Sequence, residues 1–221
     1  MSGLADKRVA VVGMGGLGCP AAQLLVHAGV SHLTLVDPDR VETSNLHRQP
    51  LYRGADVGRA KVVAAAEALR RIRPGLEISV REERLGAAQA RPLLEAHQLV
   101  LDGTDDIDAK LALSDAAVAS GVPLVYGGAI GLGGQAMLIA PGGPCLRCVF
   151  EEVPSGGPTC AQSGVLGTVV GVVGAIQASL GLEALGGDGR PGVLVRVDGR
   201  RLVRREIAIG RAADCPACGA R

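Results

Sequence analysis

The stretch that decides the fold is RVAVVGMGGLG, residues 8–18. A short strand-like run leads into the pattern Gly-x-Gly-x-x-Gly, and a segment of helical length, residues 17–28, follows at once. Glycines at such a turn let backbone N–H groups and the positive end of the helix approach a phosphate. Asp37 ends the next strand-like run at the distance where a nucleotide ribose is usually held. The pattern predicts a nucleotide site, although a tight structural turn or an NAD-dependent dehydrogenase shows the same features. The glycines concerned are Gly13, Gly15, Gly16 and Gly18.

Apolar runs of strand length alternate with segments of helical length up to Tyr126. This alternation is typical of a parallel sheet covered by helices on both faces. The expected strands are residues 8–12, 32–36, 77–81, 99–102 and 123–126, and the expected helices are residues 17–28, 59–72, 87–96 and 107–119. The sequence therefore predicts an α/β fold with a Rossmann-like, doubly wound sheet.

The rhythm changes after Gly127. A Gly-rich stretch precedes an expected strand at residues 135–139, and two closing runs, residues 193–197 and 202–209, predict a hairpin. We expect antiparallel strands to continue the sheet here. Residues 151–163 contain two prolines and two glycines without periodicity, which predicts a mobile loop. The expected organisation is a single domain of residues 1–221, with a nucleotide-binding half at 1–127 and an antiparallel half at 128–221.

The amino-acid composition bears on the partners and the location to be expected for this protein. The 221 residues are 48% hydrophobic with a net charge of +1, and aromatic residues make up 1%. A basic footprint and a stacking surface for nucleic acid are both lacking, so we expect no nucleic-acid partner. Residues 165–185 are long and apolar enough for a membrane span, but their glycines and polar residues favour a buried helix. With no secretory signal pattern at the start, we expect a cytoplasmic protein.

The loop after Asp37 distinguishes the dinucleotide of a dehydrogenase from a nucleoside triphosphate. Its sequence SNLHRQ, residues 44–49, and the following Lys61 place cations where a dehydrogenase usually needs none. Arg and Lys neutralise the charge that builds on a departing pyrophosphate, which favours a nucleoside triphosphate. A solvated basic surface is the alternative interpretation of these residues.

Acidic residues follow the fourth expected strand in the sequence DGTDD, residues 102–106. The carboxyl edge of an open α/β sheet is where such folds bind ligands. A carboxylate beside a triphosphate is a natural Mg²⁺ ligand. Capping of the next helix by Asp105 or Asp106 is the alternative, and the two roles could belong to different residues.

Two CxxC pairs supply four thiolates, the full tetrahedral set for structural zinc. Disulfides compete with this prediction, but nothing marks the chain as secreted. Cys19 is expected to be a small buried residue. Cys160 lies in the expected mobile loop and is either a nucleophile or an incidental thiol. The predicted zinc ligands are Cys145, Cys148, Cys215 and Cys218.

Taken in order, GMGGLG, Asp37, SNLHRQ, GRAK, DGTDD, the two CxxC pairs and TCAQSGVLG resemble the ubiquitin-activating-enzyme-like family. The similarity is to the bacterial adenylyltransferases of molybdopterin and thiamine biosynthesis, and it covers nearly the whole chain. It implies an enzyme that binds ATP and Mg²⁺ and adenylates the C-terminal glycine of a ubiquitin-like sulfur-carrier protein ending in Gly-Gly. It also implies a homodimer and a sulfur donor of the cysteine desulfurase or rhodanese type.

The resemblance assigns roles residue by residue. Asp37 would hold the ribose, Asp105 would bind Mg²⁺, and Cys160 matches a cysteine that some relatives use to hold sulfur or carrier covalently. Arg48, Lys61, Asp105 and Cys160 are the implied catalytic residues. The implied nucleotide contacts are Gly13, Gly15, Gly16, Gly18, Asp37, Ser44, Asn45, Leu46, His47, Arg48, Lys61, Asp105 and Asp106.

Two departures from the family pattern stand out. Asp106 replaces a usual Asn, which would place an extra negative charge near the phosphates. Relatives also carry an N-terminal Arg ahead of the first strand that this sequence lacks, so we expect slow turnover. The competing functions are ATP-dependent modification of another carboxylate, small molecule or tRNA base, and a weakly active zinc-stapled scaffold that binds a carrier.

Overall fold

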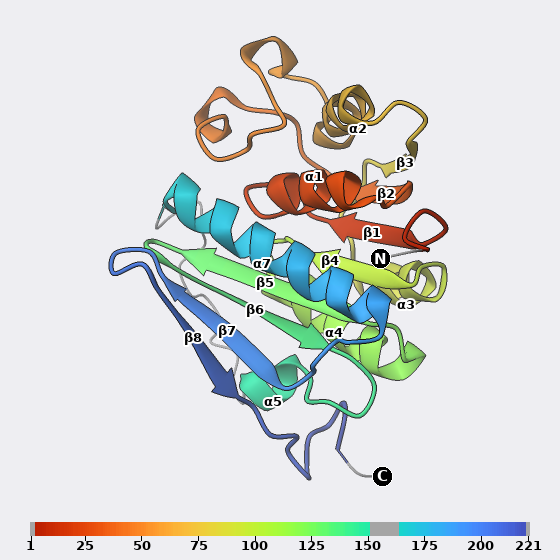
Figure 1. The fold of residues 1–221 in the computed structure, drawn as a ribbon, viewed down its shortest axis with the longest axis vertical. Coiled ribbons are helices and arrows are strands. Elements are labelled where there is room, and N and C mark those ends of the chain that lie inside the picture. Colours follow the sequence, from red (N-terminus) through yellow and green to blue (C-terminus); the bar gives the residue numbers. More distant parts are fainter. Residues whose placement is uncertain (1–2, 151–163, 220–221) are drawn as a thin grey trace.

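One eight-stranded mixed sheet forms the centre of the computed structural model, which describes residues 3–150 and 164–219 (Figure 1). Its spatial order is β3-β2-β1-β4-β5-β6-β7-β8. The parallel strands are β1 (Arg8–Val12), β2 (His32–Val36), β3 (Glu77–Arg81), β4 (Leu99–Asp102) and β5 (Leu124–Ile130). The antiparallel strands are β6 (Gly133–Ile139), β7 (Val193–Asp198) and β8 (Val203–Ala208). The predicted fold class is confirmed.

Helices cover both faces of this sheet. On one face, α1 (Gly18–Ala28), α2 (Lys61–Ile72) and α7 (Gly167–Gly186) enclose a core of Val, Leu and Ala side chains. On the other face, α3 (Ala87–Glu95), α4 (Ile107–Ser120) and the short α5 (Leu146–Val149) enclose a second core. Two 3₁₀ turns, η1 (Thr43–Asn45) and η2 (Gly54–Asp56), lie in the connection from β2 to α2.

The strand expected at residues 123–126 is too short, because β5 continues through Gly127 to Ile130. Gly127 and Gly128 pair with Ala136 and Gln135 of β6, so the change from parallel to antiparallel comes at the turn after β5. The reason for glycine at position 127 is space. A Cβ there would lie 2.4–2.6 Å from the amide of Gln177 on α7, which fills the position.

The helix α7 covers most of residues 165–185, for which the sequence favours a buried helix over a membrane span. Within the described residues it alone is long and apolar enough to cross a membrane, with a mean hydropathy of 1.6. It packs against β4, β5, β6 and α1. A Cβ at Gly174 would lie 2.6 Å from the Leu17 carbonyl oxygen, whereas one at Gly171 would meet nothing within 4 Å. Close approach to α1 therefore requires glycine at position 174 and not at 171.

Candidate functional site

A cavity of about 670 Å³ opens at the carboxyl ends of the parallel strands. It lies where doubly wound sheets bind their ligands. The predicted site residues that line it are Gly13, Gly15, Gly16, Asp37, Asn45, Arg48, Lys61, Asp105 and Asp106. The predicted residues absent from its lining are Gly18, Ser44, Leu46 and His47. The residue Cys160 and the expected mobile loop, residues 151–163, lie outside the described residues.

The glycines of the first turn divide into two roles. Gly13 has φ +86°, and a Cβ there would lie 2.6–2.7 Å from the backbone of Gly103 and Thr104. A Cβ at Gly18 would lie 1.9 Å from the Gly13 carbonyl oxygen. These two positions let the turn after β1 pack on the end of β4. Gly15 and the residue after it line the cavity, where small residues leave room for a ligand.

Asp37 is fixed at the end of β2 by backbone donors. Its carboxylate accepts hydrogen bonds from Met14 N (2.7 Å) and Asp39 N (2.8 Å), and the side chain is 6% exposed. Burial raises the pKa of the Asp37 carboxyl, and the nearby Lys61 ammonium opposes that shift. One hydrogen bond thus ties the glycine turn to the acid predicted to hold a ribose.

Lys61 begins α2 and lies buried between two carboxylates. Its Nζ is 2.8 Å from Asp39 Oδ2 and 3.8 Å from Asp37 Oδ1. The backbone N–H of Lys61 also donates to the Asp39 carbonyl oxygen at 2.9 Å. A phosphate group that binds Lys61 must therefore compete with Asp39. The sequence interpretation included Lys61 but overlooked Asp39, which shares the cavity wall.

Arg48 is oriented by its own loop. Its Nη2 donates to Asn45 Oδ1 at 2.6 Å, and its Nη1 donates to the Ser44 carbonyl oxygen at 3.3 Å. The Ser44 hydroxyl donates to Glu42 Oε2 at 3.2 Å. Leu46 packs against the core on the α1 face. Asn45 and Arg48 thus line the cavity while Ser44 and Leu46 support the loop.

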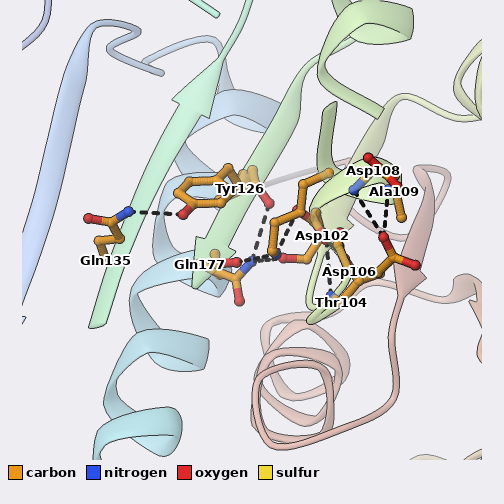
Figure 2. A network of polar contacts seen from close by, with 11 residues as sticks. Asp102, Thr104, Asp106, Asp108, Ala109, Tyr126, Gln135 and Gln177 are labelled. Atoms are coloured by element: carbon orange, nitrogen blue, oxygen red, sulfur yellow. Dashed lines mark hydrogen bonds and ion pairs between the residues drawn. The ribbon is translucent and has the colours of Figure 1, made fainter. Parts of the chain in front are cut away.

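The two neighbouring acids after β4 have different surroundings. Asp106 is the N-cap of α4, where its Oδ1 accepts from Asp108 N (2.9 Å) and Ala109 N (3.3 Å) (Figure 2). Its Oδ2 also pairs with Arg84 at 3.2 Å. Asp105 is exposed and lines the cavity. The capping alternative therefore holds for Asp106, and the extra charge expected there is balanced by Arg84.

The two CxxC pairs meet at one point. The four Sγ atoms lie within 4.8 Å of one another, and the cysteines are free thiols. The pairs Cys145–Cys215 and Cys148–Cys218 are 3.5 and 3.3 Å apart at Sγ. A tetrahedron with Zn–S bonds of ~2.3 Å has S–S edges of about 3.8 Å, so the donor set fits zinc. Cys19 is different, because burial raises the pKa of this core thiol to about 12.

A family model described as the ThiF family matches residues 1–217. The chain belongs to the ThiF family. Molybdopterin-synthase adenylyltransferase of Escherichia coli strain K12 is 40% identical over 220 residues, which is 98% of this chain and 88% of that protein. Sulfur carrier protein adenylyltransferase of Thermus thermophilus is 39% identical, over 96% of this chain and 82% of the relative. The expected resemblance to adenylyltransferases of the ubiquitin-activating-enzyme-like type is confirmed.

Solved structures support the ThiF-type fold. The crystal structure of E. coli MccB with ATP superposes with a TM-score of 0.85 and 19% identity, over 98% of this chain and 68% of that one. A complex of MccB with MccA-N7isoASN gives a TM-score of 0.87 at 19% identity, with the same coverage. At this identity the similarity concerns the fold.

Sequence reasoning missed a polar network at the wall of the ThiF-family cavity, to which Thr104 and Lys110 belong (Figure 2). Lys110 Nζ is 3.0 Å from Asp102 Oδ2 and donates to the Gly127 carbonyl oxygen at 2.6 Å. Asp102 is fully buried, and its other oxygen accepts from Thr104 N and Oγ1. From α7, Gln177 Nε2 donates to the Asp102 carbonyl oxygen at 2.8 Å. The only available signal was an acid at a strand end with a lysine 8 positions later in the chain.

Proposed function

We propose that this protein uses ATP to adenylate the C-terminal glycine of a ubiquitin-like sulfur-carrier protein. The observation that carries the proposal is one cavity that gathers the Gly15–Gly16 turn, Asp37, Arg48 and the exposed Asp105. These are a phosphate-binding turn, a ribose acceptor, a cation for pyrophosphate and a carboxylate for Mg²⁺. The names of the adenylyltransferase relatives supply the substrate class.

In the proposed reaction, an oxygen of the carrier's terminal carboxylate attacks the α-phosphorus of ATP. A P–O bond forms to the glycine, the bond to the β-phosphate oxygen breaks, and pyrophosphate leaves with its electron pair. Arg48 neutralises the leaving charge, and Asn45 keeps the guanidinium aimed at the cavity through the 2.6 Å contact. Lys61 joins it once phosphate oxygens replace the carboxylate of Asp39.

Two metals belong to the proposal. Mg²⁺ would be held by Asp105 together with phosphate oxygens, and it would neutralise charge on the phosphates. Zn²⁺ would be held by the four clustered cysteines and would anchor the C-terminal segment to α5 and α4. Arg147 of α5 reinforces that anchor through a two-point ion pair with Asp115 of α4, at 2.7–3.2 Å. This site lies on the α3–α4 face of the sheet and has a structural role.

The remaining elements of the proposal concern partners. A sulfur donor of the cysteine desulfurase or rhodanese type would convert the adenylated glycine to a thiocarboxylate, and Cys160 would act in that later step. The working unit would be a cytoplasmic homodimer. Cys160→Ala is then expected to leave adenylation unchanged and to slow thiocarboxylate formation. Loss of adenylation in this variant would contradict the assignment of Cys160 to the later, sulfur-transfer step.

The test of the site uses two alanine variants with matched controls. Arg48→Ala and Asp105→Ala are each expected to lower carrier-dependent adenylation by roughly 100- to 1,000-fold, because each removes one preorganised charge contact. Arg71→Ala on α2 and Asp108→Ala on α4 delete exposed groups of the same charge outside the cavity lining, and both should keep activity. Rates within about twofold of wild type for Arg48→Ala and Asp105→Ala would contradict the proposed site.

A further inference from the structure

Positive charge is concentrated on the β7–β8 hairpin, residues 193–208. Five arginines and two acidic residues give this hairpin a net charge of +3, while the whole chain carries +1. The rest of the chain therefore has a net charge of −2. This uneven distribution of charge indicates an acidic binding partner, because a local positive field attracts acidic ligands.

Strand register places two of these arginines side by side. Arg196 of β7 pairs with Arg205 of β8 on one side and with Gln135 of β6 on the other. Because side chains alternate along a strand, the three share one face of the sheet. Val203 and Ile207, two residues either side of Arg205, lie on that face too and are 37% and 38% exposed. Like charges directly opposite each other destabilise a sheet, so folding alone does not favour this pair.

Acidic residues of the hairpin do not neutralise the pair. Asp198 lies two residues after Arg196 on the same face, and its Oδ1 accepts two backbone N–H groups of the following turn at 3.0 and 3.1 Å. Glu206 lies on the opposite face, where it pairs with Arg204 at 2.5 Å. Within residues 3–150 and 164–219, the structure shows no ion pair to Arg196 or Arg205.

This row of side chains leads from the cavity to the edge of the sheet. Gln135 and Arg196 both line the cavity, and Gln135 Nε2 donates to the Tyr126 hydroxyl at 2.9 Å (Figure 2). Arg205 lies beyond them on β8, the outermost strand in Figure 1. All six residues of β8 are exposed. A ligand that enters the cavity from this edge therefore passes over both arginines.

We propose that the face formed by Arg196, Arg205, Val203 and Ile207 docks an acidic segment of the polypeptide whose C-terminus enters the cavity. The two guanidinium groups would receive Asp or Glu side chains, and the two apolar residues would receive aliphatic ones. This inference rests on the proposed function and adds to it a requirement for acidic residues on the carrier. A polypeptide fits better than a nucleic acid, because aliphatic side chains flank Arg205 where base stacking would require aromatic ones.

The experiment measures binding and turnover separately. Arg196→Glu and Arg205→Glu are compared with Arg71→Glu, which makes the same change in net charge on exposed α2. The probe is a ubiquitin-like carrier protein ending in Gly-Gly, used also with its surface Asp and Glu residues changed to Asn and Gln. Carrier binding is followed by calorimetry without ATP, ATP binding without carrier, and KM for the carrier at low and high salt.

Either hairpin variant should weaken carrier binding and raise the carrier KM roughly tenfold or more at low salt, whereas the Arg71→Glu control should bind carrier as wild type does. Arg205→Glu, which lies outside the cavity lining, should also leave ATP affinity unchanged. The neutralised carrier should bind wild type as weakly as the native carrier binds the variants. Arg205→Thr should lower carrier affinity without lowering the unfolding free energy, which a purely structural role would not allow.

Unchanged carrier binding and KM in both glutamate variants would overturn the inference while leaving the proposed function intact. Tighter binding of a single-stranded RNA than of carrier, lost in the same variants, would also overturn it. If no carrier is adenylated but the variants still weaken carrier binding, the proposed function fails and the docking face stands.

Discussion

Replacing the buried Lys110 by Met tests the network that supports the end of β4. The substitution preserves length and removes the ammonium, which is 3.0 Å from Asp102 Oδ2 and donates at 2.6 Å to the Gly127 carbonyl oxygen. Asp102 is fully buried, and only Oδ1 retains donors, both from Thr104. Breaking a buried ion pair by removing one partner costs about 3–5 kcal/mol, because it leaves an uncompensated charge.

Urea unfolding followed by circular dichroism measures this loss. Lys110→Met should lower the unfolding free energy by about 3–5 kcal/mol with an unchanged m-value. The double variant Asp102→Asn/Lys110→Met removes both charges and should be more stable than the sum of the two single losses predicts, by ~1–3 kcal/mol. Lys7→Met, which removes a half-buried lysine near the N-terminus, should change stability by less than about 0.5 kcal/mol.

A loss below ~1 kcal/mol for Lys110→Met, or strict additivity in the double variant, would refute this reasoning. Either result would mean that solvent reaches Asp102 and that the ion pair adds little to the rigidity of β4.

Three further predictions concern packing, metal and pH. Gly174→Ala should destabilise the protein by about 1–3 kcal/mol in thermal or urea unfolding, because its Cβ meets α1, whereas Gly171→Ala in the same helix should stabilise it by ~0.5–1 kcal/mol; equal effects would contradict the packing. Metal analysis should find one zinc per chain in wild type and in Cys19→Ala. Cys145→Ser should lose the zinc and with it much of the zinc site's contribution to the unfolding free energy, which is on the order of 10 kcal/mol. A wild-type protein that is stable without zinc would contradict the site. Burial lowers the pKa of His97 from 6.5, so its protonation favours the unfolded state, and stability that is full above pH 6.5 should fall as pH drops below it. His97→Gln should flatten that slope in urea unfolding, and an unchanged slope would exclude His97 as its source.

Much of the fold follows from local sequence, because apolar periodicity and glycine turns act within short segments. The strands at residues 8–12, 32–36, 77–81 and 99–102 match the structure at both ends. The expected end of β5 at Tyr126 is wrong, since Gly127 and Gly128 are strand residues. Glycine is required at position 127 because the Gln177 side chain of α7 fills the space that a Cβ would take. That contact spans 50 residues and leaves no local pattern.

The sequence predicted those residues of the candidate site whose role follows from the residue type and its motif. The glycine turn, Asp37, Arg48 and Asp105 line one cavity as their motifs suggested. Other roles depend on tertiary placement. Sequence alone could not divide the adjacent acids into an exposed Asp105 and a capping Asp106, because capping depends on where α4 begins.

Pairings across the fold were equally hidden. The contact of Lys61 with Asp39 joins residues 22 positions apart, and it forms because α2 starts beside the end of β2. The alignment of Arg196 with Arg205 depends on the register of a hairpin, which turn geometry sets. These pairings determine how charge is arranged around the cavity, and composition does not reveal them.

Exchange of labelled pyrophosphate into ATP tests the central claim most directly. The protein is incubated with Mg-ATP, labelled pyrophosphate and a ubiquitin-like carrier ending in Gly-Gly, alongside the same carrier with its last two glycines removed. The account predicts label in ATP only with the intact carrier, since the reverse reaction requires the acyl-adenylate. Exchange that is equal with the truncated carrier, or absent with every intact carrier while ATP and carrier both bind, would contradict the claim.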